Sequence, residues 1–133
     1  MSDSDDLAVL VQSVGTTLSQ NRLKLATVES CTGGWIAQSI TSVSGSSGWF
    51  ECGFVTYSNA AKHAQVGVPE VLIAERGAVS APVARAMARG GLDQCPADVA
   101  LSVTGIAGPG GGSEEKPVGT VFICWAARPD RVR

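Results

Sequence analysis

The chain has 133 residues, of which 44% are hydrophobic and 17% are charged, and its formal net charge is −2. This size and composition indicate a globular domain with a buried core, which excludes a disordered or fibrous protein. The weak net charge gives no broad basic surface for nucleic acid, and no apolar run approaches the ~18 residues of a membrane span.

The first third of the chain predicts a helix, a short strand and a second helix. Apolar residues recur at spacings near 3.6 through Ser4–Leu18, where Asp3 or Ser4 would be the N-cap. Leu23–Val28 is short and apolar, which is typical of a strand, and a helix is expected over about Gly33–Val43. The residues between them form a strand-to-helix junction.

The middle of the chain predicts one strand and three helices. Aromatic and β-branched residues make Trp49–Tyr57 a strand. Short helices are expected over Ala60–Val66 and Glu70–Arg76, separated by a Gly-Val-Pro break. A third helix follows Ser80, its expected N-cap, and runs to about Arg89. The many small residues of this helix favour close packing, either within the chain or between subunits.

Two strands and a long loop are expected in the last third. Ala97–Val103 is continuously apolar, as in a buried strand, and Val118–Ala126 is a further strand. Thr104–Pro117 is a glycine-rich loop between them. The order of elements indicates an α/β fold with a mixed sheet and helices on both faces. With no internal repeat and no linker, residues 1–133 are predicted to form a single domain.

The cysteines bear on metal binding and on location. None of the four forms a CxxC pair or lies close to His63, the only histidine, so a zinc site is poorly supported. The N-terminus is acidic where a secretory signal would be basic and then apolar. We therefore expect reduced thiols in a cytoplasmic protein that holds no metal.

The junction Ser30-Cys31-Thr32-Gly33-Gly34 is the first candidate for chemistry. In one interpretation Ser30 attacks a carbonyl carbon, and backbone N–H groups of the Thr32–Gly34 turn hold the oxyanion. In the other, Ser30 or Thr32 only caps the helix and the glycines allow tight packing. Cys31 is a rival nucleophile, because a helix N-terminus also activates a thiol.

A serine nucleophile needs a base, and two neighbouring residues are candidates. His63 is the only histidine, but Lys62 follows a strand-to-helix turn of the same kind as that at Ser30. A lysine that is desolvated in a pocket loses pKa and accepts a proton near neutral pH. Tyr57 either donates a hydrogen bond within the site or is a tyrosine on its rim. The ordinary alternative for Lys62 is a solvated surface side chain.

A second glycine cluster runs from Thr104 to Gly112 and contains Gly105, Gly108 and Gly110. It follows a buried strand at the end where open α/β sheets bind ligands. Its backbone N–H groups would form a nest for phosphate, which Lys116 would help to neutralise. The pattern is neither GxGxxG nor GxxxxGK[ST], so it fits no standard nucleotide fingerprint. The alternative is a surface loop without a ligand.

Five motifs in this order resemble the CinA C-terminal-domain family over nearly the whole chain, from about Leu7 to Trp125. They are Val28-Glu29-Ser30-Cys31-Thr32-Gly33-Gly34, Tyr57-Ser58-Asn59 with Lys62, Gly77-Ala78-Val79-Ser80, Thr104-Gly105-Ile106-Ala107-Gly108-Pro109-Gly110-Gly111 and Lys116-Pro117-Val118-Gly119-Thr120-Val121. The resemblance implies a three-layer α/β/α sandwich. Stand-alone members are nicotinamide mononucleotide (NMN) deamidases, so it also implies hydrolysis of the NMN carboxamide to nicotinate mononucleotide and ammonia.

The resemblance also implies roles for residues. Ser30 matches the family's nucleophile and Lys62 its base, with Tyr57 nearby as a third catalytic residue. The substrate-binding positions that it implies are Thr32, Gly33, Gly34, Thr104, Gly105, Gly108 and Gly110. No metal or organic cofactor is implied. The expected partner is the nucleotide substrate, with no nucleic acid or membrane, and a homo-oligomer is expected, a dimer being favoured.

The chain also departs from the family's pattern. Family domains usually continue for about one more helix after the last strand, whereas this chain stops at Arg133, and the family's molybdopterin-binding-like N-terminal domain does not precede it. These departures keep an alternative function open. A non-catalytic nucleotide-binding or regulatory module of the same fold would keep the pocket without turnover.

Overall fold

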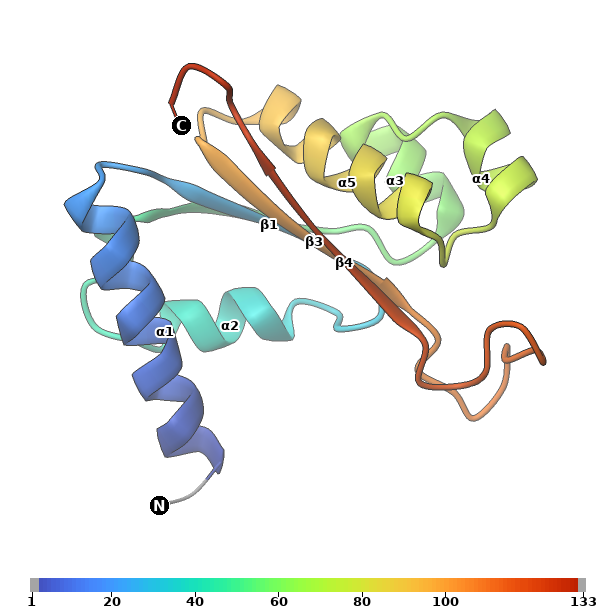
Figure 1. Cartoon of the computed structure of the whole chain (residues 1–133), viewed down its shortest axis with the longest axis horizontal. Helices are drawn as coiled ribbons and strands as arrows, with labels where there is room; N and C mark the ends of the chain where they lie inside the picture. The colour runs from blue at the N-terminus through green and yellow to red at the C-terminus, as the bar shows by residue number, and fades with distance from the viewer. Residues whose placement is uncertain (1–2, 132–133) are drawn as a thin grey trace.

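A mixed sheet between two layers of helices forms the protein, and the computed structural model describes residues 3–131 (Figure 1). Helices α1 and α2 cover one face of the sheet, and α3, α4 and α5 cover the other. The elements in chain order are α1 (Asp3–Gln20), β1 (Leu25–Glu29), α2 (Trp35–Thr41), the 3-10 turn η1 (Ser46–Gly48), β2 (Phe50–Val55), α3 (Asn59–Val66), α4 (Glu70–Arg76), α5 (Ala81–Gln94), β3 (Val99–Gly105) and β4 (Val121–Ala127). The predicted α/β class and the predicted order of helices and strands are confirmed.

The topology of the sheet brings three strand ends to one edge. The strand order is β2-β1-β3-β4, in which β1 pairs in parallel with β2 and β3, and β4 runs antiparallel to β3. At the carboxyl end, Glu29 is level with both Val55 and Val103. The segments that follow β1, β2 and β3 therefore lie side by side, which is where parallel sheets place ligand sites.

The central strand β1 is buried on both faces because helices cover it from each side. Leu25 packs with Val11 of α1 and Ile40 of α2, whereas Ala26 packs with Ala88 and other small residues of the opposite layer. This alternation follows from the period of two along a strand. Among the described residues, one apolar cluster therefore lies on the face covered by α1 and α2, and two lie on the opposite face.

The small residues of α5 pack inside the chain. A Cβ atom added at Gly90 would overlap the carbonyl of Val66 in α3, and one at Gly91 would lie 2.6 Å from Val28 Cγ2 in β1. These two glycines therefore allow α5 to approach both α3 and the sheet. At these two positions the predicted close packing is made within the chain.

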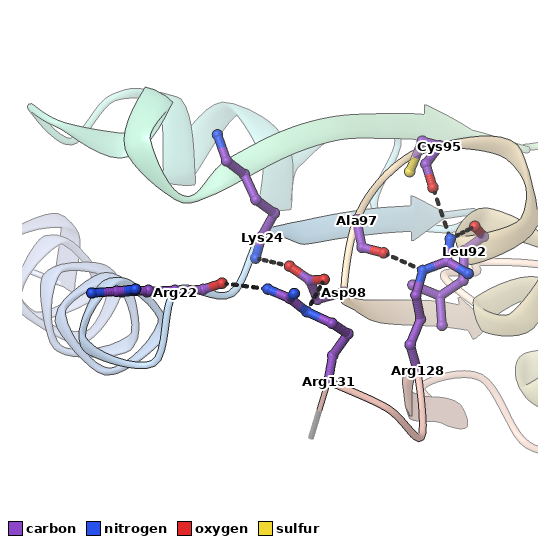
Figure 2. A network of polar contacts seen from close by, with 8 residues as sticks. All are labelled: Arg22, Lys24, Leu92, Cys95, Ala97, Asp98, Arg128 and Arg131. Atoms are coloured by element: carbon purple, nitrogen blue, oxygen red, sulfur yellow. Dashed lines mark hydrogen bonds and ion pairs between the residues drawn. The ribbon is translucent and has the colours of Figure 1, made fainter. Parts of the chain in front are cut away.

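A polar network holds the edge of the sheet at which β1 and β3 begin (Figure 2). The Arg128 guanidinium donates to the carbonyls of Leu92, Cys95 and Ala97, which satisfies the end of α5. Asp98 accepts from the backbone N–H of Lys24 at 2.8 Å and forms an ion pair with Arg131. These side chains stabilise the edge at which the strands begin, and the segments that follow β1, β2 and β3 lie at the opposite edge.

Several predicted boundaries were wrong. Helix α5 continues to Gln94 rather than Arg89, because Leu92 is buried and the two glycines before it are held by packing. Strand β4 begins at Val121 rather than Val118, since the Thr120 carbonyl closes a turn with the N–H of Ile106. Strand β1 includes Glu29, which had been placed in the junction.

Smaller differences between the predicted and observed boundaries occur at β2, α2 and α1. β2 ends at Val55, two residues before the predicted end, and α2 begins at Trp35, because Gly33 and Gly34 take left-handed backbone conformations. The chain is already helical at Asp3, so Asp3 and Ser4, the two predicted N-cap residues, both lie within α1. Within residues 3–131, no helix has both the length and the apolar character needed to cross a lipid bilayer.

Candidate active site

Ser30 and Lys62 meet at the carboxyl edge of the sheet. Ser30 directly follows β1, and its N–H donates to the Val103 carbonyl at 3.0 Å, which ties it to β3. Lys62 lies in the first turn of α3, which the Ser58 side chain caps by accepting from the N–H of Ala61. Lys62 Nζ is 3.0 Å from Ser30 Oγ. The two side chains are 1% and 6% exposed, so solvent barely reaches this contact.

Lys62 is surrounded by neutral oxygen atoms. Its Nζ donates to the carbonyls of Thr56 and Tyr57, both at 3.0 Å, in addition to the contact with Ser30. Burial lowers the pKa of Lys62 below its ordinary 10.5, and the nearby Cys31 acts in the opposite direction with a smaller effect. A lysine with a lowered pKa holds a neutral amine at lower pH, so it can take a proton from a neighbouring hydroxyl.

Tyr57 reaches this pair through its main chain. The Tyr57 carbonyl accepts from Lys62 and, at 3.4 Å, from Ser30 Oγ. The Tyr57 residue itself is 71% exposed, at the mouth of the cavity described next. The structure thus brings together the three residues that the sequence analysis assigned to catalysis, although the polar contacts of Tyr57 come from its backbone.

A cavity of about 280 Å³ lies next to Ser30. One wall consists of Ser30, Cys31 and Tyr57. The other is the last residue of β3, Gly105, with the loop that follows it, through Ile106, Ala107, Gly108, Gly110 and Gly111. The two walls meet where Gly105 faces Cys31, because a Cβ atom added there would lie 3.0 Å from the Cys31 sulfur. The predicted positions Gly105, Gly108 and Gly110 therefore line the same cavity as Ser30.

The other four predicted substrate-binding positions do not line this cavity. Thr32 Oγ1 donates to the Glu29 carboxylate at 2.7 Å, and the Gly33 N–H donates to the Ser30 carbonyl at 3.0 Å. Thr104 is buried, and its hydroxyl donates to the Ala78 carbonyl at 2.9 Å. Gly34 precedes α2 as its N-cap. Substrate binding by these four residues stays a prediction, since none of them lines the cavity.

The rival residues of the sequence analysis have different surroundings. His63 points away from Ser30, with Nδ1 2.9 Å from the Val68 carbonyl and Nε2 3.3 Å from the Glu70 carboxylate. Lys116 Nζ donates to the Arg76 carbonyl at 3.4 Å and does not line the cavity. Burial raises the pKa of the Cys31 thiol, which leaves less of the reactive thiolate. Of the two candidate bases, only Lys62 contacts Ser30.

Glu29 belongs to this site, and the sequence analysis gave it no role. Its carboxylate is buried and accepts from the N–H groups of Ile36 and Ala37 at 2.9 and 3.0 Å, besides the hydroxyl of Thr32. The signal was an acidic residue immediately before a glycine-rich helix start without a side-chain cap of its own. Within residues 3–131, no three His, Cys, Asp or Glu side chains are grouped to hold a metal ion.

The protein is thus an α/β/α sandwich with a serine-lysine pair at the carboxyl ends of its parallel strands. The chain belongs to the CinA C-terminal domain family, whose model matches residues 7–132. The nicotinamide-nucleotide amidohydrolase PncC of Escherichia coli K12 is 55% identical over 126 residues, which are 95% of this chain and 76% of that relative. A CinA-like protein of Akkermansia muciniphila is 56% identical over 95% of this chain, which spans only 30% of that relative.

Solved structures agree with this assignment. A competence/damage inducible protein, CihA, from Agrobacterium tumefaciens superimposes with a TM-score of 0.90 at 46% identity, over 92% of this chain and 74% of that one. A CinA superfamily protein from Escherichia coli gives a TM-score of 0.89 at 34% identity, over 96% and 74% of the two chains. The predicted three-layer sandwich is the fold of this family.

Proposed function

We propose that this protein is a nicotinamide-nucleotide amidohydrolase that converts NMN and water into nicotinate mononucleotide and ammonia. The observation that carries the proposal is the 3.0 Å contact between Ser30 Oγ and Lys62 Nζ at the wall of a 280 Å³ cavity. The similarity to proteins named nicotinamide-nucleotide amidohydrolase supports the choice of substrate. The predicted dimer and the predicted cytoplasmic location stay predictions.

The surroundings of Lys62 suit a base for Ser30. A neutral amine has two N–H donors and one lone pair. In the structure Lys62 Nζ donates to Ser30 Oγ, and the Ser30 hydroxyl donates to the Tyr57 carbonyl. In the neutral amine the carbonyls of Thr56 and Tyr57 take both donors, so the lone pair can accept the Ser30 hydroxyl proton once it turns from Tyr57 toward Nζ. A charged ammonium would use its third proton on Ser30 Oγ and hold no free lone pair. The neutral form is therefore the reactive one.

The reaction then proceeds in two halves. Ser30 Oγ attacks the carboxamide carbon while its proton moves to Lys62 Nζ, which gives a tetrahedral intermediate. Lys62 returns this proton to the leaving nitrogen, the carbon–nitrogen bond breaks and ammonia departs, leaving an ester on Ser30. Water attacks the ester with Lys62 again as the base, and nicotinate mononucleotide is released as Ser30 regains its proton.

The oxyanion of the intermediate needs N–H donors beside Ser30. The N–H groups of Cys31 and Thr32 are the first two after Ser30 in the chain, and Cys31 lines the cavity. We place the oxyanion at these two donors. The Gly33 N–H, which the sequence analysis had also included, is engaged by the Ser30 carbonyl.

Ammonia release from NMN tests the proposal, with nicotinamide and NAD as parallel substrates. Ser30→Ala should reduce kcat by about 10³-fold or more, because the nucleophile is removed while its neighbours stay in place. Cys31→Ala is the matched control, and it should keep activity within about threefold. Full activity of Ser30→Ala would refute the nucleophile. Binding of NMN by calorimetry without ammonia release from the unmodified protein would favour the non-catalytic module instead.

A further inference from the structure

Glu29 is a buried carboxylate that sits directly before the proposed nucleophile. It is 1% exposed, and the ion pairs found among residues 3–131 do not include it. An ionised carboxylate in such a place is unfavourable unless several donors compensate it. Neutral hydrogen-bond donors in the segment after Glu29 compensate its carboxylate, and these donors identify the part of the chain that Glu29 holds in place.

Those partners join the end of β1 to the start of α2. Oε1 accepts from the Thr32 hydroxyl at 2.7 Å and from the Ile36 N–H at 2.9 Å, and Oε2 accepts from the Ala37 N–H at 3.0 Å. The N-cap residue Gly34 has no side chain to satisfy these N–H groups. Glu29 therefore caps α2 in place of Gly34. Its hydrogen bonds to Ile36 and Ala37 hold the end of β1 against the start of α2, and Ser30 lies in the segment between them.

The main chain of Glu29 extends the connection toward Lys62. Its carbonyl accepts from the N–H of Thr56 at 2.7 Å and from the Thr56 hydroxyl at 3.2 Å. The Thr56 carbonyl in turn accepts from Lys62 Nζ. One residue thus connects the segment that carries the proposed nucleophile with the segment that holds the proposed base.

We propose that Glu29 is a positioning residue, whose ionised carboxylate holds the Ser30–Gly34 turn against α2 and thereby sets Ser30 Oγ against Lys62. This inference rests on the proposed function for its kinetic consequences. Glu29 does not line the cavity, so it contacts no substrate. The occupied N–H groups of Ile36 and Ala37 also mean that the positive end of α2 is balanced by a group of the protein itself.

Glu29→Gln is the informative substitution because it keeps the size of the side chain. The amide group replaces one acceptor oxygen by an N–H donor, which then faces a backbone N–H or the Thr32 hydroxyl. The turn must shift, and displacements of about 1 Å at reacting groups lower rates by about 10²-fold. We expect kcat to fall by that factor and KM to change less than about threefold, since the cavity walls away from the turn remain.

Two readouts separate positioning from a general loss of folded protein. The first is the kcat-against-KM split, with activity expressed per folded molecule after circular dichroism and thermal melting. The second is hydrogen exchange of the Ile36 and Ala37 amides, followed by mass spectrometry of the peptide that contains them. The Glu29 carboxylate accepts from both N–H groups, so Glu29→Gln should make these amides exchange faster. The matched control is Glu51→Gln, the same change on the exposed side of β2, which should leave both readouts unchanged.

The outcomes decide the inference separately from the proposed function. Unchanged kcat in folded Glu29→Gln would overturn it, and so would unchanged exchange of the Ile36 and Ala37 amides. If Glu29→Gln fails to fold, Thr32→Val tests the same contact more gently, and it must lower kcat in the same direction. If the unmodified protein releases no ammonia from NMN, the function fails, but amide exchange in Glu29→Gln still decides whether the carboxylate holds the turn against α2.

Discussion

The two glycine-rich segments that enclose the cavity are held in opposite ways. Both follow a buried strand of the sheet, one through Ser30–Gly34 and the other through Gly105–Gly112. The first is anchored from within by the buried Glu29 carboxylate and by the bond from Ser30 to β3. The second is exposed from residue 107 to 115 and is tied at its base by bonds between Ile106 and the chain at 119–120.

This difference assigns different tasks to the two walls. A nucleophile must be held within about 0.5 Å of its productive position, which demands buried and fully bonded neighbours. A wall that receives a substrate has to approach it closely and adjust, and an exposed loop of glycines suits that task. We therefore expect changes at the Ser30 wall to act on kcat, and changes at the loop to act on KM.

Replacing Lys62, which contacts Ser30, by Met should have the largest effect on kcat. The side chain keeps its length but loses the amine, so kcat should fall by about 10³-fold, within the range found for a general base. The carbonyls of Thr56 and Tyr57 lose a donor as well, which thermal melting would detect. Lys24→Met, at the opposite edge of the sheet, is the control and should leave kcat unchanged. Equal activity of both variants would contradict the assignment of the base.

The pH dependence sharpens the same prediction. In the proposed mechanism the neutral amine is the reactive form, so kcat/KM should rise with pH and level off above the pKa of Lys62, which burial lowers from 10.5. Stability should follow the same direction. Unfolded chains keep the ordinary pKa and bind more protons between the two values, so the free energy of unfolding rises with pH in that window. Lys62→Met should abolish both effects. A pH-independent kcat/KM in the unmodified protein would argue against a titrating lysine.

At the loop, Gly108→Ala should raise KM for NMN by about tenfold with a smaller change in kcat. Gly108 has φ +79°, and an added Cβ would lie 2.5 Å from Val118 Cγ1, so the loop must move. Gly110→Ala meets nothing within 4 Å and should change KM by less than Gly108→Ala does. Gly48→Ala, remote from the cavity and also in open space, is the control for glycine replacement. An unchanged KM in Gly108→Ala would mean that the loop does not contact substrate.

The sequence predicts the features that follow from local patterns, whereas features that depend on contacts in the folded chain could not be predicted. Period-two and period-3.6 patterns gave the order of elements, and parallel pairing then brings Ser30, Tyr57 and the Gly105 loop to one edge. Lys62 was a candidate because it followed a similar turn. Glu29 could not be assigned, since its role depends on its distances to N–H groups seven and eight residues later. The C-terminal end of α5 was also predicted too early. Gly90 and Gly91 are typical of a helix end, and only the structure shows that they pack against Val66 and Val28.

Tyr57→Phe should have the smallest effect, because the contacts that join Tyr57 to Ser30 and Lys62 come from its carbonyl. Phe keeps that carbonyl and the ring, so kcat should stay within about threefold of the unmodified enzyme. Tyr57→Ala also keeps the carbonyl but removes the ring from the cavity mouth, so it should raise KM more than kcat falls. Ammonia-release kinetics on both variants check this. A loss near 10²-fold in Tyr57→Phe alone would show that the phenol takes part in proton transfer, and Tyr57 would then act through its side chain as well as through its carbonyl.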